Sequence, residues 1–335
     1  MNIQSRKNIL AVIFSGTAWI FVSCATNNPF VVASVFNPYP NIRTHGFENA
    51  FLYETGNLSA DTLIISIEGS GWGSVLGLRQ MGFWVYTGMT AQVIQPLRRD
   101  HVFIVPEKWE RDPRSRAWIH AGVYFEDHNL RWLYTIENLI EMYAASINAF
   151  LSENHFESIF LVGASEGAFI LPSLYQRISD RERIRGMVSF AGGGLSLYES
   201  ITILSTDERT PRRVREAYVY TIENHENSEV RLNSTDVDRF GNVLRWLTSM
   251  MEFSPLGYWE NINIPVLFLH GERDFNVAVE STRYIQENLP GKPFEFIFYG
   301  NMRHLPNPWS LNYTFQYHRI RNDIANWIRR IQNTE

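Results

Sequence analysis

The sequence predicts an α/β protein built on a doubly wound, mostly parallel sheet that carries a helical cap insertion. Short apolar runs rich in β-branched and aromatic residues alternate with segments of helical spacing, which is typical of successive βαβ units. Apolar residues make up 45% and charged residues 19% of the 335-residue chain, a balance that allows a sizeable buried core. One long interval without strand signals predicts the insertion.

The expected strands are short, bounded by turns and, in the centre of the sheet, apolar enough to be buried on both faces. They span residues 50–53, 63–67, 102–105, 158–162, 186–190, 266–269 and 294–298. Helices with apolar spacing near 3.6 are expected at 129–151, 166–176, 278–288 and 312–331. The interval from about 195 to 263, with a helical pattern at 237–251, is too long for a simple crossover and is expected to form the cap.

The N-terminus has the layout of an export signal. Arg6 and Lys7 precede an apolar run at 9–22, which as a helix reaches only about 21 Å at 1.5 Å per residue. A bilayer core is about 30 Å thick, so the run is short for a membrane span. We expect a signal peptide at 1–23, a tether at 24–40 and the folded domain at 41–335, with an uncleaved membrane anchor as the alternative.

Cys24 is the only cysteine of the chain, so it cannot form an internal disulfide. Together with Phe21, Val22 and Ser23 it resembles the lipobox of bacterial lipoproteins, although Phe21 stands where leucine is usual. The resemblance implies an acylated Cys24 and a protein exported and lipid-anchored to a bacterial cell membrane, on its periplasmic or surface side. The net charge of −5 and the lack of a long basic run argue against a nucleic-acid partner.

A serine lies between two glycines at a predicted strand-to-helix turn. The residues from Gly163 to Gly167 read G-x-S-x-G, directly after the strand at 158–162. Such a turn is too tight for bulk at the glycine positions, and it presents the hydroxyl of Ser165 above the sheet at a helix N-terminus. Ser165 is therefore the candidate nucleophile, and a passive serine in a glycine-bearing turn is the alternative.

A serine nucleophile needs a base within hydrogen-bond reach and an acid that orients the base. Asp274 and His304 each follow the end of an expected strand, where the functional groups of parallel sheets gather. We expect His304 to be the general base and Asp274 the orienting acid. Glu272 is the local rival of Asp274, and His270 is the rival of His304, although its position favours packing or hydrogen bonding beside the acid turn.

Acyl transfer also needs preorganised N–H donors for the oxyanion. We expect one donor from Glu166 and a second from Ser70 or Gly71, in the glycine-rich loop after the strand at 63–67. A nucleotide-binding loop is the competing interpretation, but the third glycine of the dinucleotide fingerprint and the lysine of the P-loop are missing. No cofactor and no metal site are expected, because the sequence lacks an H-E-x-x-H motif and a Cys-His cluster.

The order Ser165, Asp274, His304, each at a strand end, resembles the α/β-hydrolase superfamily over nearly the whole mature chain. The likeness is to its esterase, lipase and serine-peptidase-like branches, with departures at Glu68, where many members have histidine, and at Ala168, where glycine is frequent. The resemblance implies metal-free hydrolysis of a small-molecule carboxylic ester through an acyl-enzyme. Peptide or amide hydrolysis and a catalytically silent binding protein are the alternatives.

The apolar side chains of the expected cap leave two interpretations open. They either line an acyl pocket or pack the cap on the domain, and the second role is the more ordinary one. The side chains in question are Trp246, Met250, Met251, Phe253 and Trp259.

Overall fold

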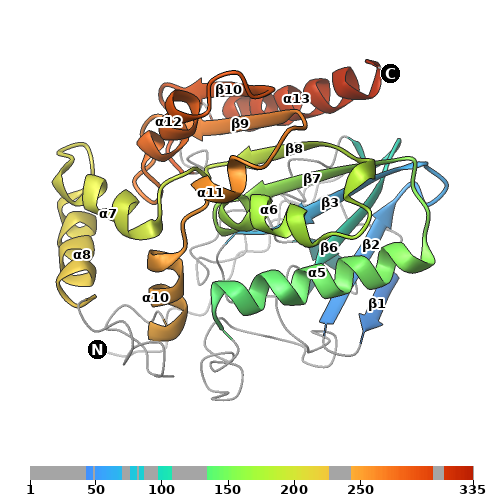
Figure 1. Cartoon of the computed structure of the whole chain (residues 1–335), viewed down its shortest axis with the longest axis horizontal. Coiled ribbons are helices and arrows are strands. Elements are labelled where there is room, and N and C mark those ends of the chain that lie inside the picture. Colours follow the sequence, from blue (N-terminus) through green and yellow to red (C-terminus); the bar gives the residue numbers. More distant parts are fainter. Residues whose placement is uncertain are drawn as a thin grey trace, which may run out of the picture.

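A computed structural model of the chain describes residues 43–47, 50–69, 76–80, 83–86, 97–107, 134–225, 243–304 and 313–334. Its main sheet has eight strands in the order β1-β2-β6-β3-β7-β8-β9-β10 (Figure 1). Neighbours from β6 to β10 run parallel, whereas β2 is antiparallel to both β1 and β6. The strands are β1 Arg43–Phe47, β2 Ala50–Gly56, β3 Thr62–Ile67, β6 Val102–Pro106, β7 Ser158–Ala164, β8 Ile184–Phe190, β9 Val266–Gly271 and β10 Phe294–Tyr299.

The predicted mostly parallel sheet is thereby confirmed, with additions at its edge and outside it. The edge strand β1 and the separate antiparallel pair of β4 (Leu76–Gln80) and β5 (Phe83–Tyr86) were not expected from the sequence. The described helices are α5 Ile136–Glu153, α6 Glu166–Arg177, α7 Leu197–Thr206, α8 Arg212–Glu223, α10 Leu244–Glu252, α11 Leu256–Trp259, α12 Val279–Asn288 and α13 Tyr313–Gln332.

Helices cover the sheet on both faces. Successive residues of a strand point to opposite sides, so each central strand contributes side chains to two cores. In β7, Leu161 enters the core formed with α5 and α6, while Phe160 and Val162 enter the core formed with α13. Trp327 of α13 meets Phe160 edge to face, with ring centroids 6.4 Å apart. Figure 1 shows α5 and α6 in front of the sheet. This two-sided cover explains why the central strands are apolar throughout rather than alternating.

Helix α5 begins seven residues later than the start expected at residue 129. Thr135 is its N-cap, and the Thr135 side chain accepts a hydrogen bond of 3.2 Å from the backbone N–H of Asn138. A threonine at this position satisfies one of the N–H groups that have no partner within the helix. Residues 129–133 lie outside the described part of the chain.

The expected cap interval contains α7, α8, α10 and α11, and residues 226–242 within it lie outside the described residues. Helices α7, α8 and α10 lie beyond the carboxyl ends of β7, β8 and β9 (Figure 1). Helix α11 has a different place, because Trp259 packs against Phe268 of β9 and Phe294 of β10, at centroid distances of 4.9 and 6.2 Å. Three helices of the interval therefore face the strand ends, and the fourth supports the sheet.

The predicted signal peptide, the tether and Cys24 lie outside the described residues. In the described part, none of the helices combines the length and the apolar character that a bilayer crossing requires.

Candidate active site

The turn between β7 and α6 holds Ser165 in a strained backbone conformation. Its φ of 53° and ψ of −119° lie where residues with a side chain are rare, at a cost of about 1–3 kcal/mol. A Cβ on Gly163 would lie 2.6 Å from the carbonyl oxygen of Gly167, and one on Gly167 would lie 2.2 Å from the carbonyl oxygen of Ile67. The backbone leaves no room for a side chain at either position, which is the physical reason for both glycines.

The turn that carries Ser165 is fixed to its neighbours through the backbone. The N–H of Ser165 donates to the carbonyl of Phe190 at 2.8 Å, and α6 begins at the next residue, Glu166. The N–H groups of the first helical turn have no partner within the helix and carry a positive partial charge. The turn therefore places Ser165 at the positive end of α6.

The loop after β3 passes directly beside the serine. A Cβ built on Gly69 would lie 3.1 Å from Cβ of Ser165 and 3.7 Å from its Oγ. The expected oxyanion donors Ser70 and Gly71 lie outside the described residues. Gly69, the residue before Ser70, is the last described residue of this loop, and a side chain at this position would meet the serine.

Asp274 and His304 meet although thirty residues separate them. The parallel pairing of β9 and β10 sets Tyr299 beside Gly271, so the loops that follow both strands leave the sheet at the same point. Nδ1 of His304 lies 2.7 Å from Oδ2 of Asp274. The other oxygen, Oδ1, accepts the N–H groups of Asn276 and Val277 at 2.8 and 3.1 Å.

Asp274 is an ionised carboxylate although its side chain is 0% exposed. Burial alone would raise the pKa of this carboxyl, but the charge of His304 and the hydrogen bonds from His270 and His304 hold the pKa well below its ordinary value. The N–H donors at Oδ1 fix the carboxylate in the turn and leave Oδ2 facing His304. Since an ionised carboxylate can only accept, Nδ1 of His304 donates the proton of this contact. Whenever the ring is neutral, its lone pair is therefore on Nε2.

The alternative acid Glu272 and the alternative base His270 do not line the cavity that contains Ser165. Glu272 pairs with Arg283 of α12 at 3.0 Å, and both side chains are more than a third exposed. His270 is fully buried, and its Nε2 lies 3.3 Å from the same Oδ2 of Asp274.

Ser165 and His304 both line one cavity of about 330 Å³. Its walls come from α6, from the loops after β8 and β9, and from α7, α8 and α10. The volume is at the lower end of the usual range for small-molecule sites. Six apolar side chains dominate the lining: Phe169, Leu195, Leu197, Ile201, Leu247 and Met250.

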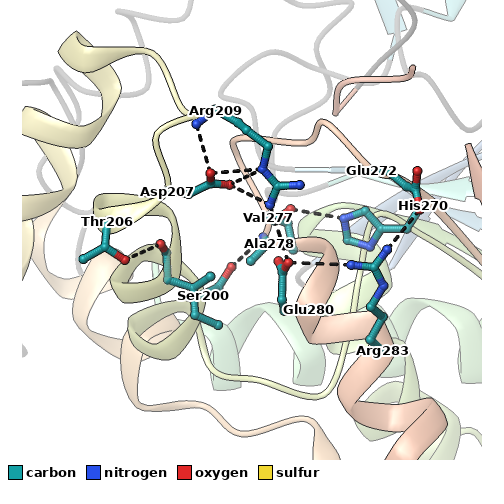
Figure 2. A network of polar contacts seen from close by, with 11 residues as sticks. Ser200, Thr206, Asp207, Arg209, His270, Glu272, Val277, Ala278, Glu280 and Arg283 are labelled. Atoms are coloured by element: carbon teal, nitrogen blue, oxygen red, sulfur yellow. Dashed lines mark hydrogen bonds and ion pairs between the residues drawn. The ribbon is translucent and has the colours of Figure 1, made fainter. Parts of the chain in front are cut away.

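Three polar side chains around this cavity form hydrogen bonds with other parts of the protein. Nε1 of Trp246 in α10 donates to Oε2 of Glu166 at 2.8 Å. Tyr218 of α8 donates its hydroxyl to the carbonyl of Phe275 at 2.7 Å. Oγ of Ser200 in α7 accepts the N–H of Ala278 at 2.8 Å, as Figure 2 shows. The last two bonds join α7 and α8 to the loop that carries Asp274.

The apolar residues of the expected cap pack the cap on the domain, and two of them also line the cavity. All five are buried in the core on the α5 and α6 face, and Trp246 and Met250 line the cavity as well. The cavity residues of α7 and α8, such as Ile201 and Tyr218, were not predicted from the sequence. Their amphipathic spacing predicts helices, but it does not say which strand ends those helices face.

Metal ligands do not gather at this site. The described residues contain no group of three or more His, Cys, Asp or Glu side chains positioned to hold a metal ion.

No family model and no curated protein sequence matches the chain. Solved structures do. The proline iminopeptidase of Mycobacterium smegmatis superposes with a TM-score of 0.54 at 11% identity, over 88% of this chain and 99% of that one. The fold is that of the α/β-hydrolases.

Two further structures share the α/β-hydrolase fold. Est1E from Butyrivibrio proteoclasticus has a TM-score of 0.51 at 10% identity, and the alignment covers 86% of this chain and 99% of that one. An esterase from Exiguobacterium antarcticum has a TM-score of 0.50 at 9% identity, with 84% of this chain and 96% of that one covered. At such low identity the likeness establishes the architecture, and the chemistry of this chain has to be argued from its own residues.

Proposed function

We propose that the protein is a serine hydrolase that cleaves carboxylic esters through an acyl-enzyme, with Ser165 as nucleophile, His304 as general base and Asp274 as the acid that orients the base. The observation that carries the proposal is the hydrogen-bonded pair of Asp274 and His304, whose imidazole lines the same cavity as Ser165. A serine at a helix N-terminus and an imidazole held by a carboxylate are the groups that activate a hydroxyl.

The reaction follows from the proton positions. Oγ of Ser165 attacks the ester carbonyl carbon, while Nε2 of His304 takes the hydroxyl proton. The same proton passes to the leaving alcohol as the acyl-enzyme forms. His304 then takes a proton from water, whose oxygen attacks the acyl carbon, and returns this proton to Oγ of Ser165 as the bond between Oγ and the acyl carbon breaks and the carboxylic acid leaves. Asp274 keeps its charge throughout and stabilises the imidazolium that forms in each half-reaction.

The oxyanion of each tetrahedral intermediate needs N–H donors that are already in place. We assign one donor to Glu166, at the start of α6, and the second to Ser70 or Gly71. The closeness of Gly69 to Ser165 supports this assignment, because it brings the loop after β3 to the serine.

An ester with an apolar acyl group is the substrate that the cavity favours. The lining is mainly apolar, and the side chains of Glu166, Ser200 and Tyr218 bond to the protein itself. An apolar acyl chain needs no polar partner there and gains from leaving water. In this proposal α7, α8 and α10 act as the cap that shapes the acyl site.

Hydrolysis of peptides or amides is the second candidate, supported by the likeness of fold to a proline iminopeptidase. The test compares p-nitrophenyl esters of increasing chain length with aminoacyl p-nitroanilides, using the wild-type protein and Ser165→Ala. We expect ester turnover that falls on the order of a thousandfold or more in the variant. Ser173→Ala, a buried serine of α6 away from the cavity, is the matched control.

The outcomes separate the candidates. Faster cleavage of anilides than of esters would favour the peptidase. Ester turnover that survives in Ser165→Ala would mean another nucleophile, and no turnover of either substrate class would favour a catalytically silent binding protein.

We also propose that the protein is exported and lipid-anchored through Cys24 to a bacterial cell membrane. The support is the placement of the single cysteine two residues after the end of the apolar run at 9–22. Cells fed a labelled fatty acid should incorporate it into the wild-type protein and not into Cys24→Ala. An unlabelled wild-type protein that stays in the membrane fraction would point to an uncleaved helix instead.

A further inference from the structure

His270 is a second histidine in contact with Asp274, and the proposed reaction does not use it. His270 lies near the carboxyl end of β9, and its side chain is 0% exposed. Its Nδ1 lies 2.7 Å from Oγ1 of Thr282 in α12. Its Nε2 lies 3.1 Å from the carbonyl oxygen of Val277, a contact drawn in Figure 2, and 3.3 Å from Oδ2 of Asp274.

The hydroxyl of Thr282, which lies beside Nδ1 of His270, has already donated its proton to another group. The hydroxyl of Thr282 donates to the carbonyl of Gly192 at 2.7 Å. Since a hydroxyl has a single proton, Oγ1 is left as an acceptor toward His270. Nδ1 of His270 must therefore carry a proton to make its 2.7 Å contact.

The contacts of Nε2 also require a proton on the ring nitrogen. The carbonyl of Val277 can only accept, and so can the ionised carboxylate of Asp274. A neutral ring protonated at Nδ1 would set the lone pair of Nε2 against these acceptors, at a side chain that is 0% exposed. A neutral ring protonated at Nε2 would leave Nδ1 as an acceptor, so Thr282 would have to donate to Nδ1 and give up its hydrogen bond to the carbonyl of Gly192. Only the doubly protonated ring gives every contact a proton.

We propose that His270 is a buried imidazolium that shares the carboxylate of Asp274 with His304 and thereby sets the pH range in which His304 can act as a base. The charge state of His270 follows from its own contacts, whereas its effect on activity rests on the proposed function. In this account His270 is a positioning residue, because it acts on the reaction only through Asp274.

The groups around His270 leave Asp274 as its direct counter-charge. Asp274 is shared with His304, and the phenol of Tyr218 faces the same carboxylate from α8. Burial, followed by the charge of Asp274, raises the pKa of the Tyr218 phenol above its ordinary value, so this group stays neutral. Farther out, Glu272 and Glu280 pair with Arg283 at partly exposed positions, where solvent screens their charges (Figure 2).

The direction of the effect on catalysis follows from charge balance. A lone buried carboxylate would strongly favour the charged form of His304 and would keep the base protonated to higher pH. An imidazolium at the same carboxylate cancels part of that attraction. His304 is then neutral, and able to accept the serine proton, at lower pH than it would be beside Asp274 alone. His270 therefore extends activity toward acid.

The charge state can be read directly by NMR of the protein labelled with ¹⁵N in its histidine rings. At pH 8 we expect both ring nitrogens of His270 to be protonated, with the signals assigned by their loss in His270→Gln. One protonated and one unprotonated nitrogen in the His270 ring would overturn the proposal. This measurement does not depend on any enzymatic activity, so it can fail or succeed separately from the proposed function.

Two substitutions then test the effect on activity. Thr282→Val removes the acceptor of Nδ1 without touching Asp274 or His304, and Thr282→Ser keeps the hydroxyl as the matched control. We expect the acidic limb of the pH profile of ester turnover to move upward by roughly one pH unit in Thr282→Val and to stay in place in Thr282→Ser.

His270→Gln separates charge from shape, because the amide can still donate to Asp274 but carries no charge. The same upward movement of the acidic limb is expected, with turnover at pH 8 retained. If His270 has only a structural role, the acidic limb of the pH profile should not move in His270→Gln. That result would overturn the proposed effect of His270 on the base. If His270→Gln does not fold, the comparison of Thr282→Val with Thr282→Ser still decides.

Discussion

The two walls of the cavity are held by different kinds of interaction. At the Ser165 turn, backbone meets backbone, and added Cβ atoms on Gly163 or Gly167 would lie within 2.6 Å of a carbonyl oxygen. Helices α7 and α8 are instead attached to the opposite loop by hydrogen bonds, such as that from Tyr218 to Phe275. The first wall tolerates no added atom, whereas the second can lose single contacts and keep its shape. The backbone geometry at Ser165 is therefore fixed by the fold, and under the proposed function we expect substrate choice to depend on α7 and α8.

The strongest test of this contrast is Gly167→Ala. Its Cβ would lie 2.2 Å from the carbonyl oxygen of Ile67, so the helix must move away from the sheet. We expect the free energy of unfolding to fall by at least about 3 kcal/mol. Gly257→Ala is the control, because a Cβ on Gly257 of α11 meets nothing within 4 Å and alanine favours a helix. Urea denaturation of both variants measures the difference, and equal midpoints would contradict the account.

Asp274→Asn tests the wall opposite the Ser165 turn, in the loop to which α7 and α8 are hydrogen-bonded. The amide can donate toward His304 and so favours the wrong tautomer of the base. We expect the turnover number for esters to fall roughly 1,000- to 10,000-fold. Glu272→Gln, which changes the rival carboxylate without touching His304, should leave turnover within about threefold of the wild type, since its ion pair is exposed. A larger loss in Glu272→Gln than in Asp274→Asn would exchange the roles of the two acids.

Asp274 also predicts a pH dependence of stability. Its pKa in the folded protein lies below the ordinary value of about 3.9 of an unfolded chain. Such a group stabilises the fold fully above that value, and the stabilisation is lost as the pH falls through the folded pKa. The stability advantage of the wild type over Asp274→Asn should therefore shrink below about pH 4. Thermal unfolding at stepwise lower pH measures it, and an advantage that grew toward acid would be contrary to this sign.

Tyr218→Phe removes one attachment of α8 and should have a smaller effect. The variant leaves the partly buried carbonyl of Phe275 without its donor, which costs about 1 kcal/mol of stability. Because that carbonyl adjoins Asp274, we expect ester turnover to fall several-fold. Tyr284→Phe, on the exposed side of α12, is the matched control. Activity and unfolding measured together would refute the attachment if both tyrosine variants behaved alike.

Arg209→Ala should change least. Its guanidinium, 62% exposed, contacts Asp207 at 2.8 Å and Glu280 at 3.7 Å, joining the α7–α8 connection to α12 (Figure 2). Exposed ion pairs contribute up to about 1 kcal/mol and weaken in salt. We expect a loss of stability within that limit which vanishes in 1 M salt, where the Debye length is about 3 Å, compared with about 10 Å at 0.1 M. A larger, salt-independent loss would show that α8 depends on this contact.

The sequence predicted the parts of the fold that repeat a simple pattern. Central strands such as β7 were placed almost to the residue, because burial on both faces makes them apolar throughout. The edge strand β1 was missed, since one-sided pairing leaves no such pattern in Arg43–Phe47. Pro172 lies inside α6 without ending it, so the predicted helix was correct in spite of a residue that often stops helices.

The sequence also brought Asp274 and His304 to neighbouring strand ends, where the structure has them in contact. The sequence could not show that His270 and His304 share the carboxylate of Asp274, because the contact of His270 with Asp274 depends on how the turn folds back toward β9. The hydrogen bond between Trp246 and Glu166 was equally out of reach, since 80 residues and an insertion separate the two side chains. Spacing predicts where elements end, and only three-dimensional packing decides which side chains then meet.

The central claim is that Ser165 is the reactive hydroxyl, and a fluorophosphonate probe tests it most directly. Treatment of the purified protein, proteolysis and mass spectrometry should place a single adduct on the peptide that contains Ser165, and Ser165→Ala should remain unlabelled while Ser173→Ala is labelled normally. An adduct on another residue, or an unmodified wild-type protein, would contradict the account.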